Sequence, residues 1–230
     1  MIKVQLEEVR KQIATAAYEA KRDVNDITLI AVSKTYPASA IEEAIDEGCK
    51  DFGENHVQEL CKKIEMIKEP VNWHLIGHLQ TNKVKYIIGK TALIHSLDRL
   101  KLAEEIEKQS AKAGIVTKVL LEVNVADETS KHGFKVDEVM DALKVINEMK
   151  HIKVEGLMTV APFVENAEEN RPIFRKLYDL SVDIQKQKFD NISTNILSMG
   201  MSNDYRIAIE EGATMVRIGT AIFGNRDYSK

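Results

Sequence analysis

Apolar runs alternate with amphipathic helical patterns along the chain, and this alternation is the strongest constraint on its fold. The apolar runs predict short buried strands, because they are rich in aliphatic and β-branched residues. They begin near Ile27, Lys50, Asn72, Ala92, Lys118, Lys153, Ile196 and Thr214. Strands that alternate with helices pair in parallel through right-handed crossovers. The chain is therefore predicted to be an α/β protein with a parallel sheet.

Eight such units without an interrupting linker predict one closed (β/α)8 barrel of the TIM type. Residues 1–22 repeat apolar side chains at helical spacing and predict an extra N-terminal helix, so that the barrel covers 27–230 and a single domain covers 1–230. An open doubly wound sheet is the alternative. The absence of a Gly-rich dinucleotide fingerprint after the first strand argues against that alternative.

Several helix ends have sequence signals. Pro37 is expected at the start of a helix, and Gly48 just past its end. Ser96 or Asp98 is predicted to cap the helix that stops before Gly114.

Charge and composition exclude several classes of function. The net charge of −4 argues against nucleic-acid binding by bulk electrostatics. No run approaches the roughly 18 apolar residues of a membrane span, and the acidic start is unlike a signal peptide. Cys49 and Cys61 have no C-x-x-C spacing and fit a reducing compartment. We expect a cytoplasmic protein that binds neither membrane nor nucleic acid.

Lys34 ends the first predicted strand, just before Pro37. In a barrel the active site lies at the carboxyl ends of the strands. A lysine held there and partly stripped of water has a lowered pKa, because desolvation disfavours the ammonium form. The neutral amine attacks aldehydes to form imines. Lys34 is therefore a candidate for covalent attachment of an aldehyde.

The seventh and eighth predicted strands end in small and polar residues. Ser198, Gly200 and Ser202 follow the seventh, and Gly219 and Thr220 follow the eighth. These two loops commonly form the phosphate site of this fold, and glycine lets backbone amides approach an anion. Serines and glycines also occur in ordinary loops, but their presence in both positions favours an anion site.

Arg217 lies inside the eighth strand, where an arginine requires a partner. That partner is either a structural carboxylate or an acceptor atom on a ligand, because arginine only donates hydrogen bonds. His74 and His78 are four residues apart, but no third ligand is near them in the sequence. We therefore expect no metal site.

Six segments of the sequence resemble the pyridoxal phosphate homeostasis protein family. They are 31–34, 52–55, 73–83, 156–159, 197–202 and 216–224. The resemblance covers essentially the whole chain in order. This family looks like the barrel domain of alanine racemase standing alone.

The resemblance implies a fold-type III barrel that holds pyridoxal 5′-phosphate on Lys34 as a Schiff base. It places Ser198, Met199, Gly200, Ser202, Gly219 and Thr220 at the phosphate end of the cofactor. Arg217 would face the pyridine nitrogen, and Asn55 would lie near the ring. The implied role is homeostasis of vitamin B6 and amino acids, with cofactor-dependent apo-enzymes or pyridoxal kinase as partners. We expect a monomer.

A racemase that uses the same cofactor is the main alternative. Racemisation needs an acid/base group on each face of the substrate carbon, and Tyr36 and His78 are the nearest candidates beside Lys34. The chain ends at Lys230 without the additional domain of racemases, and an arginine at the pyridine nitrogen weakens the ring as an electron sink. We therefore expect cofactor binding without robust catalysis. A Schiff-base aldolase on a sugar phosphate and an interaction scaffold are further alternatives.

Overall fold

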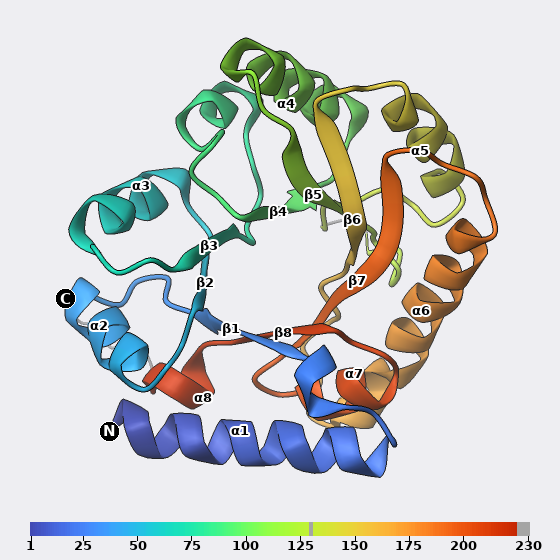
Figure 1. Cartoon of the computed structure of the whole chain (residues 1–230). Helices are drawn as coiled ribbons and strands as arrows, with labels where there is room; N and C mark the ends of the chain where they lie inside the picture. Colours follow the sequence, from blue (N-terminus) through green and yellow to red (C-terminus); the bar gives the residue numbers. More distant parts are fainter. Residues whose placement is uncertain (129–130, 225–230) are drawn as a thin grey trace.

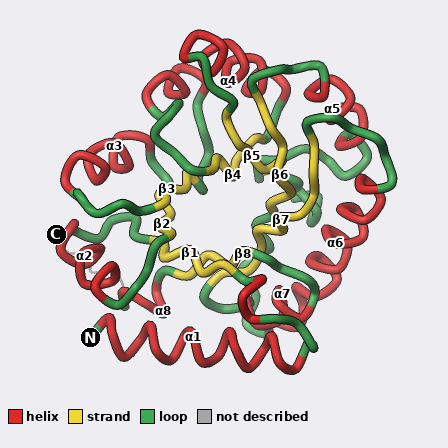
Figure 2. The backbone as a smooth tube through the Cα atoms, viewed as in Figure 1, coloured by secondary structure: helices red, strands yellow, loops and turns green. Residues whose placement is uncertain are grey.

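The computed structural model describes residues 1–128 and 131–224, and its eight strands form a closed barrel. Each strand pairs in parallel with the next, and β8 returns to β1, as the central ring in Figure 2 shows. The predicted barrel is confirmed, and an open sheet is excluded. Residues 225–230 of the predicted range lie outside the described residues. The strands are β1 (Thr28–Val32), β2 (Asp51–Glu54), β3 (Asn72–Leu75), β4 (Leu93–Leu97), β5 (Thr117–Glu122), β6 (Ile152–Met158), β7 (Ile192–Met201) and β8 (Met215–Ile218).

The helices surround the strand ring (Figure 1). Most crossovers are α-helical, but the connection between β3 and β4 is a 3₁₀ helix. The α-helices are α1 (Ile2–Glu19), α2 (Ala38–Asp46), α3 (Val57–Met66), α4 (Leu100–Ala113), α5 (Val139–Asn147), α6 (Arg171–Gln185), α7 (Tyr205–Glu210) and α8 (Thr220–Phe223). The 3₁₀ helices are η1 (Val24–Asp26), η2 (Thr81–Tyr86) and η3 (Ala167–Asn170).

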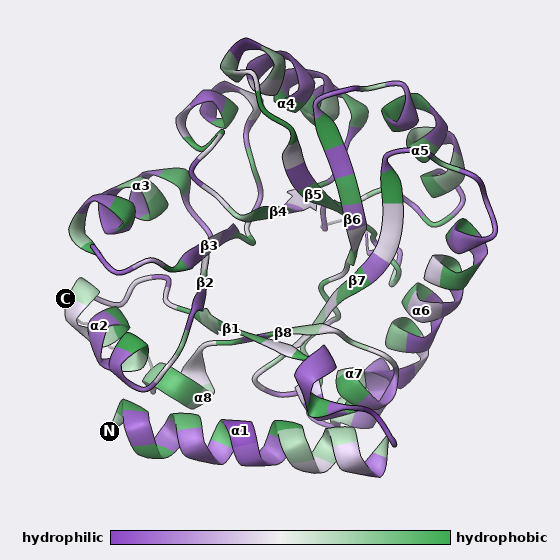
Figure 3. Cartoon of the chain, viewed as in Figure 1, coloured by the Kyte–Doolittle hydropathy of each residue, from purple (hydrophilic) through white to green (hydrophobic). Residues whose placement is uncertain are grey.

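The N-terminal helix α1 lies across the outside of the barrel, against α2, α7 and α8. Its apolar residues fall on one face, where Leu6, Val9 and Ile13 are buried. Figure 3 shows that hydrophilic and hydrophobic residues alternate along this helix. Most of its charged residues are exposed. After the helix, Arg22 donates hydrogen bonds to the carbonyl oxygens of Ile209 (2.8 Å) and Ala213 (2.7 Å), which ties α1 to the end of α7.

The element boundaries agree with the sequence prediction except at three places. The N-terminal helix predicted over 1–22 ends at Glu19. Seven strands begin within one residue of the expected position, but β7 begins at Ile192, four residues before Ile196. The sequence prediction missed the start of β7 because these residues are polar. In the structure, the hydroxyl of Thr194 donates a hydrogen bond to the carbonyl oxygen of Ser181. The predicted cap of α4 is wrong: Ser96 lies buried within β4, and the helix begins after Arg99 without a side-chain cap.

The hydrophobic core has two parts. The larger part lies between the strands and the helices, and the smaller fills the barrel around Leu93, Leu120 and Met158. The remainder of the interior contains buried polar side chains, among them His74, His95 and Arg217. Within the described residues, no helix is long and apolar enough to cross a bilayer.

Candidate functional site

A cavity of about 340 Å³ lies at the carboxyl ends of β1, β2, β7 and β8. This volume is in the range of small-molecule sites, about 300–1,000 Å³. Six residues predicted from the sequence line it: Lys34, Asn55, Ser202, Arg217, Gly219 and Thr220. The barrel thus brings together groups that are up to 186 positions apart, from Lys34 to Thr220.

Three other predicted residues do not line this cavity. Ser198 is buried beneath it and accepts a hydrogen bond from Arg217. Met199 has its side chain in the core. Gly200 has a φ of +88°, and an added Cβ would lie 2.8 Å from the Cα of Tyr205. Glycine at this position therefore serves both the left-handed backbone and the close approach of α7.

The turn that carries Lys34 is held by a buried ionic network. Lys63 on α3 donates 2.7 Å hydrogen bonds to the carbonyl oxygen of Ser33 and to the carboxylates of Glu54 and Glu59. Ser33 also donates its hydroxyl to Glu54 at 2.6 Å. Burial raises the pKa of Glu54, while the hydrogen bonds from Lys63 and Ser33 oppose that rise.

The same network fixes the residue after Lys34. Thr35 has a φ of +70°, which is unfavourable for a β-branched residue. Its backbone N–H donates to Glu59 at 2.6 Å, and Glu59 is itself bound by Lys63. Since the neighbours of Lys34 on both sides are anchored to α3, the turn has a defined conformation at the cavity wall.

Arg217 is a buried cation on the cavity wall. Its guanidinium donates to the hydroxyl of Ser198 at 2.7 Å and to the carbonyl oxygen of Thr159 at 2.8 Å. In the part of the chain that the structure describes, it forms no ion pair with a carboxylate. Desolvation lowers its pKa to about 10, against the opposing charges of Asp204 and Glu122. Arg217 therefore stays protonated at neutral pH and offers only donors.

Behind Arg217, a relay of buried hydrogen bonds crosses the barrel. His95 contacts the hydroxyl of Ser198 through Nδ1 (2.9 Å) and Nδ1 of His74 through Nε2 (2.9 Å). His74 then contacts Asp51 through Nε2 at 3.1 Å. Burial holds the pKa of His95 well below its usual value, so this ring is neutral.

The donor roles in this relay follow from its carboxylate end, because the Asp51 carboxylate only accepts hydrogen bonds. A neutral His74 ring that donates through Nε2 to Asp51 accepts at Nδ1 from Nε2 of His95. The neutral His95 ring then accepts at Nδ1 from the hydroxyl of Ser198, whose oxygen accepts from Arg217. The hydrogen bonds all run in one direction, from Arg217 at the cavity to Asp51 at the start of β2.

The loops after β7 and β8 meet at the cavity. The backbone N–H of Gly219 donates to the hydroxyl of Ser202 at 3.3 Å. Asp204 accepts from the backbone N–H of Met201 (2.7 Å) and from Asn170 (2.8 Å), which secures the loop after β7. Hydroxyl groups and backbone amides thus lie together on one cavity wall.

The candidate acid/base groups of a racemase lie elsewhere. Tyr36 donates its hydroxyl to the carbonyl oxygen of Gly224 at 2.6 Å and packs on Phe223. His78 contacts Asp98 at 2.9 Å. Neither side chain lines the Lys34 cavity. His74 and His78 also have different partners: His74 belongs to the buried relay, whereas His78 contacts Asp98.

The sequence prediction missed the groups that support the site. Lys63 and Glu59 form an ordinary (i, i+4) helix pair in sequence, and only the fold brings them to Ser33. His95 lies within the fourth predicted strand, and nothing near it in the sequence indicates a partner. The exposed Phe163, on the loop after β6, also lines the cavity and had no local signal.

Comparison with known proteins identifies close relatives. The chain matches the family described as "Alanine racemase, N-terminal domain" over residues 4–227. It is 48% identical to the pyridoxal phosphate homeostasis protein of Aquifex aeolicus over 224 residues, 97% of each chain. It is also similar to the structure of PipY from Synechococcus elongatus with pyridoxal phosphate bound, with a TM-score of 0.85 and 32% identity over 97% of this chain and all of that one. An alanine racemase from Clostridium difficile shares the fold at 14% identity and a TM-score of 0.71, over 94% of this chain and 56% of the racemase.

Proposed function

We propose that this chain, which belongs to the pyridoxal phosphate homeostasis protein family, binds pyridoxal 5′-phosphate in the Lys34 cavity and takes part in vitamin B6 and amino-acid homeostasis. The observation that carries the proposal is the set of groups around one cavity. An amine, two hydroxyls and a buried guanidinium line it, on Lys34, Ser202, Thr220 and Arg217.

This donor set fits a phosphorylated pyridine aldehyde. The Lys34 amine suits the aldehyde, and the hydroxyls of Ser202 and Thr220, with the Gly219 amide, suit a phosphate dianion. Arg217 suits a pyridine nitrogen that acts as an acceptor. The guanidinium forms no ion pair with a carboxylate among the described residues, although the charges of Asp204 and Glu122 act on it, so it stays a cationic donor on the cavity wall.

Each residue has one role in this proposal. Lys34 holds the cofactor covalently, Ser202 and Thr220 bind its phosphate, and Asn55 lies beside its ring. Ser198 fixes the orientation of Arg217 by accepting one of its hydrogen bonds. The bound cofactor supplies an aldehyde that condenses with amines and a ring that withdraws electrons. Met199 and Gly200 support the wall from behind through the core and the packing of α7.

The role of Arg217 favours holding the cofactor over turning substrates over. A protonated arginine leaves the ring nitrogen unprotonated, and this makes the ring a weak electron sink. We propose a monomeric cytoplasmic protein that exchanges cofactor with apo-enzymes or with pyridoxal kinase. An amino-acid racemase would sustain exchange of the α-hydrogen with deuterated solvent at about 1 s⁻¹ or faster; we expect no exchange at that rate.

Borohydride reduction tests the proposal directly. Protein incubated with pyridoxal phosphate is reduced, digested and analysed by mass spectrometry, and we expect one adduct, on Lys34. Lys34→Ala should lose both the adduct and the visible absorption band of the bound cofactor. Lys131→Ala is the matched control, because Lys131 lies at the same mouth of the barrel and binds the carbonyl oxygen of Val160. An adduct spread over several lysines, or one retained in Lys34→Ala, would contradict the proposal.

A further inference from the structure

A second cluster of ligand-type side chains lies at the barrel mouth, at the ends of β3, β4 and β5. His78 follows β3, Asp98 follows β4, and His132 lies on the loop after β5. One donor atom from each of the three residues lies within 4.8 Å of the other two. His74, which the sequence pairs with His78, takes no part.

The distances from Asp98 to the two histidines are close to those between the ligands of a metal site. Oδ2 of Asp98 lies 2.9 Å from Nδ1 of His78 and 3.7 Å from Nδ1 of His132. In a tetrahedral zinc site with bonds of about 2.0–2.1 Å, neighbouring ligand atoms are about 3.3–3.4 Å apart. Shifts of a few tenths of an ångström at the two histidines would therefore bring both Nδ1 atoms to this distance from Oδ2 of Asp98. The two imidazole rings are stacked, with centroids 3.8 Å apart and planes inclined by 18°, so one ring has to turn about its side-chain bonds before both Nδ1 atoms can bind the same ion.

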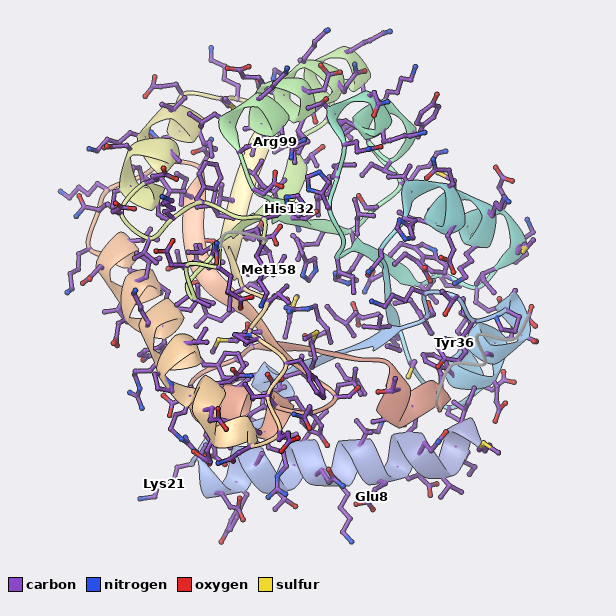
Figure 4. The ribbon with its side chains drawn as sticks, turned by 180° about the vertical axis from the view of Figure 1, so that it is seen from behind. Glu8, Lys21, Tyr36, Arg99, His132 and Met158 are labelled. Carbon is purple, nitrogen blue, oxygen red and sulfur yellow. The ribbon has the colours of Figure 1, made fainter. Side chains whose placement is uncertain are left out.

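The carboxylate is oriented for this role by its surroundings. Asp98 is buried, and its Oδ1 accepts a short hydrogen bond from Arg99, which is fixed in turn by the carbonyl oxygen of Leu79 at 3.0 Å. Oδ2 is thereby left to the two histidines. Such outer partners orient metal ligands in known sites. Figure 4 shows Arg99 and His132 together on the α4 side of the barrel, away from Tyr36.

An independent observation comes from Glu122 at the end of β5. The residue is 8% exposed, and within residues 1–128 and 131–224 its side chain makes no hydrogen bond or ion pair, although the charge of Arg217 acts on it. It lines a cavity of about 210 Å³ together with Asn124, Lys131 and His132. A buried carboxylate without a partner is costly unless a cation or a hydrogen-bond donor compensates it. Glu122 is therefore a further acidic group beside the cluster, and a bound cation would favour its ionised form.

We propose that His78, Asp98 and His132 bind one divalent transition-metal ion of the zinc class, with Glu122 beside it. Two imidazoles and one carboxylate suit such an ion, and the exposure of His78 and His132 leaves a path from solvent. Binding needs both Nδ1 lone pairs, so the ring proton of each histidine moves to Nε2. Because His132 belongs to the loop after β5, the ion would tie this loop to β3 and β4. The proposal does not depend on the proposed function.

Metal titration of untagged, cofactor-loaded protein tests the site. We expect Co²⁺ to bind with one ion per chain in calorimetry and to develop visible absorption of a low-symmetry site. His132→Ala and His78→Ala should weaken binding at least about 100-fold, since even the loss of an outer partner costs about 10–100-fold. The side chain of His132 is 57% exposed and that of His78 is 34% exposed, so neither belongs to the core and these variants should fold, which circular dichroism checks.

Two controls separate this site from other sources of binding. His151→Ala removes a surface histidine that is paired with Glu107 at 2.8 Å and should bind Co²⁺ like the wild type. Lys34→Ala lacks covalently held cofactor and should also bind normally, which distinguishes the cluster from metal chelated by the cofactor. Equal affinity of His132→Ala and wild type, or loss of binding in Lys34→Ala, would overturn the assignment.

Discussion

The stability of the Lys34 turn should depend strongly on Lys63. In Lys63→Met, the hydrogen bonds to Ser33, Glu54 and Glu59 are lost, while Glu54 remains fully buried. One oxygen of Glu54 already lacks a partner, so the variant leaves this carboxylate with a single hydrogen bond, from Ser33. An uncompensated buried charge is the main cost of this change.

The magnitude follows from the burial of the pair. The side chains of Lys63 and Glu54 are 6% and 0% exposed, so solvent does not screen the loss. Removing one partner of a buried ion pair costs about 3–5 kcal/mol. For a domain of this size, each kcal/mol corresponds to about 2–4 °C in Tm, so we expect a decrease of roughly 6–20 °C. Lys62→Met, on the same helix but exposed, should change the free energy of unfolding by less than about 0.5 kcal/mol.

The pH dependence provides a second signature. Burial already raises the pKa of Glu54 in the folded protein, and losing Lys63 raises it further. The folded variant therefore binds a proton more tightly than the unfolded chain, whose glutamates titrate near about 4.3. The stability deficit should be smallest below that pH and should grow as the pH rises through the folded pKa.

Urea unfolding at several pH values, with and without cofactor, measures these effects. The double variant Lys63→Met/Glu54→Gln should recover part of the loss, because no buried charge remains. The reasoning is refuted if Lys63→Met loses less than about 1 kcal/mol at neutral pH, or if the effects of the two substitutions simply add.

Four further substitutions probe the cavity wall and the relay. Ser202→Ala and Thr220→Val should each weaken cofactor retention by about 1–3 kcal/mol, and an unchanged cofactor off-rate in both would contradict the phosphate placement. Gly200→Ala should unfold at several degrees lower temperature, because its Cβ would meet the Tyr205 backbone at a positive φ; a wild-type Tm would disprove this. His95→Ala should lose about 2–5 kcal/mol of stability in urea, since two buried hydrogen bonds and the ring volume disappear, and a loss below about 1 kcal/mol would speak against the relay.

The sequence predicted the barrel because its signals are local. Apolar runs and helical spacing are each read within a few residues, and they set seven strand starts to within one position. The start of β7 was missed because Ser193 and Thr194 look like a loop, although tertiary packing makes them a strand. The cap of α4 was misjudged because β4 extends through Ser96 to Leu97.

The site was predicted in outline only, since its parts meet across the barrel. Strand ends pointed to Lys34, Arg217 and the loops after β7 and β8, which do line one cavity. The partners of these groups lie on other strands and helices, and register decides which side chains face each other. Nothing in the sequence near Ser198 indicates that His95 is within hydrogen-bond distance. The same holds for His132, which only the closed barrel brings to Asp98.

The one-way order of the relay behind Arg217 connects the start of β2, at Asp51, with the cavity at the carboxyl ends of the strands. Every dipole from Arg217 to Asp51 is aligned, so each bond polarises the next and the row behaves as a unit. The side chain of Asp51 is 22% exposed and is therefore in contact with solvent. We expect substitutions near Asp51 to change the electrostatic potential at Arg217 without altering any atom that a bound molecule touches.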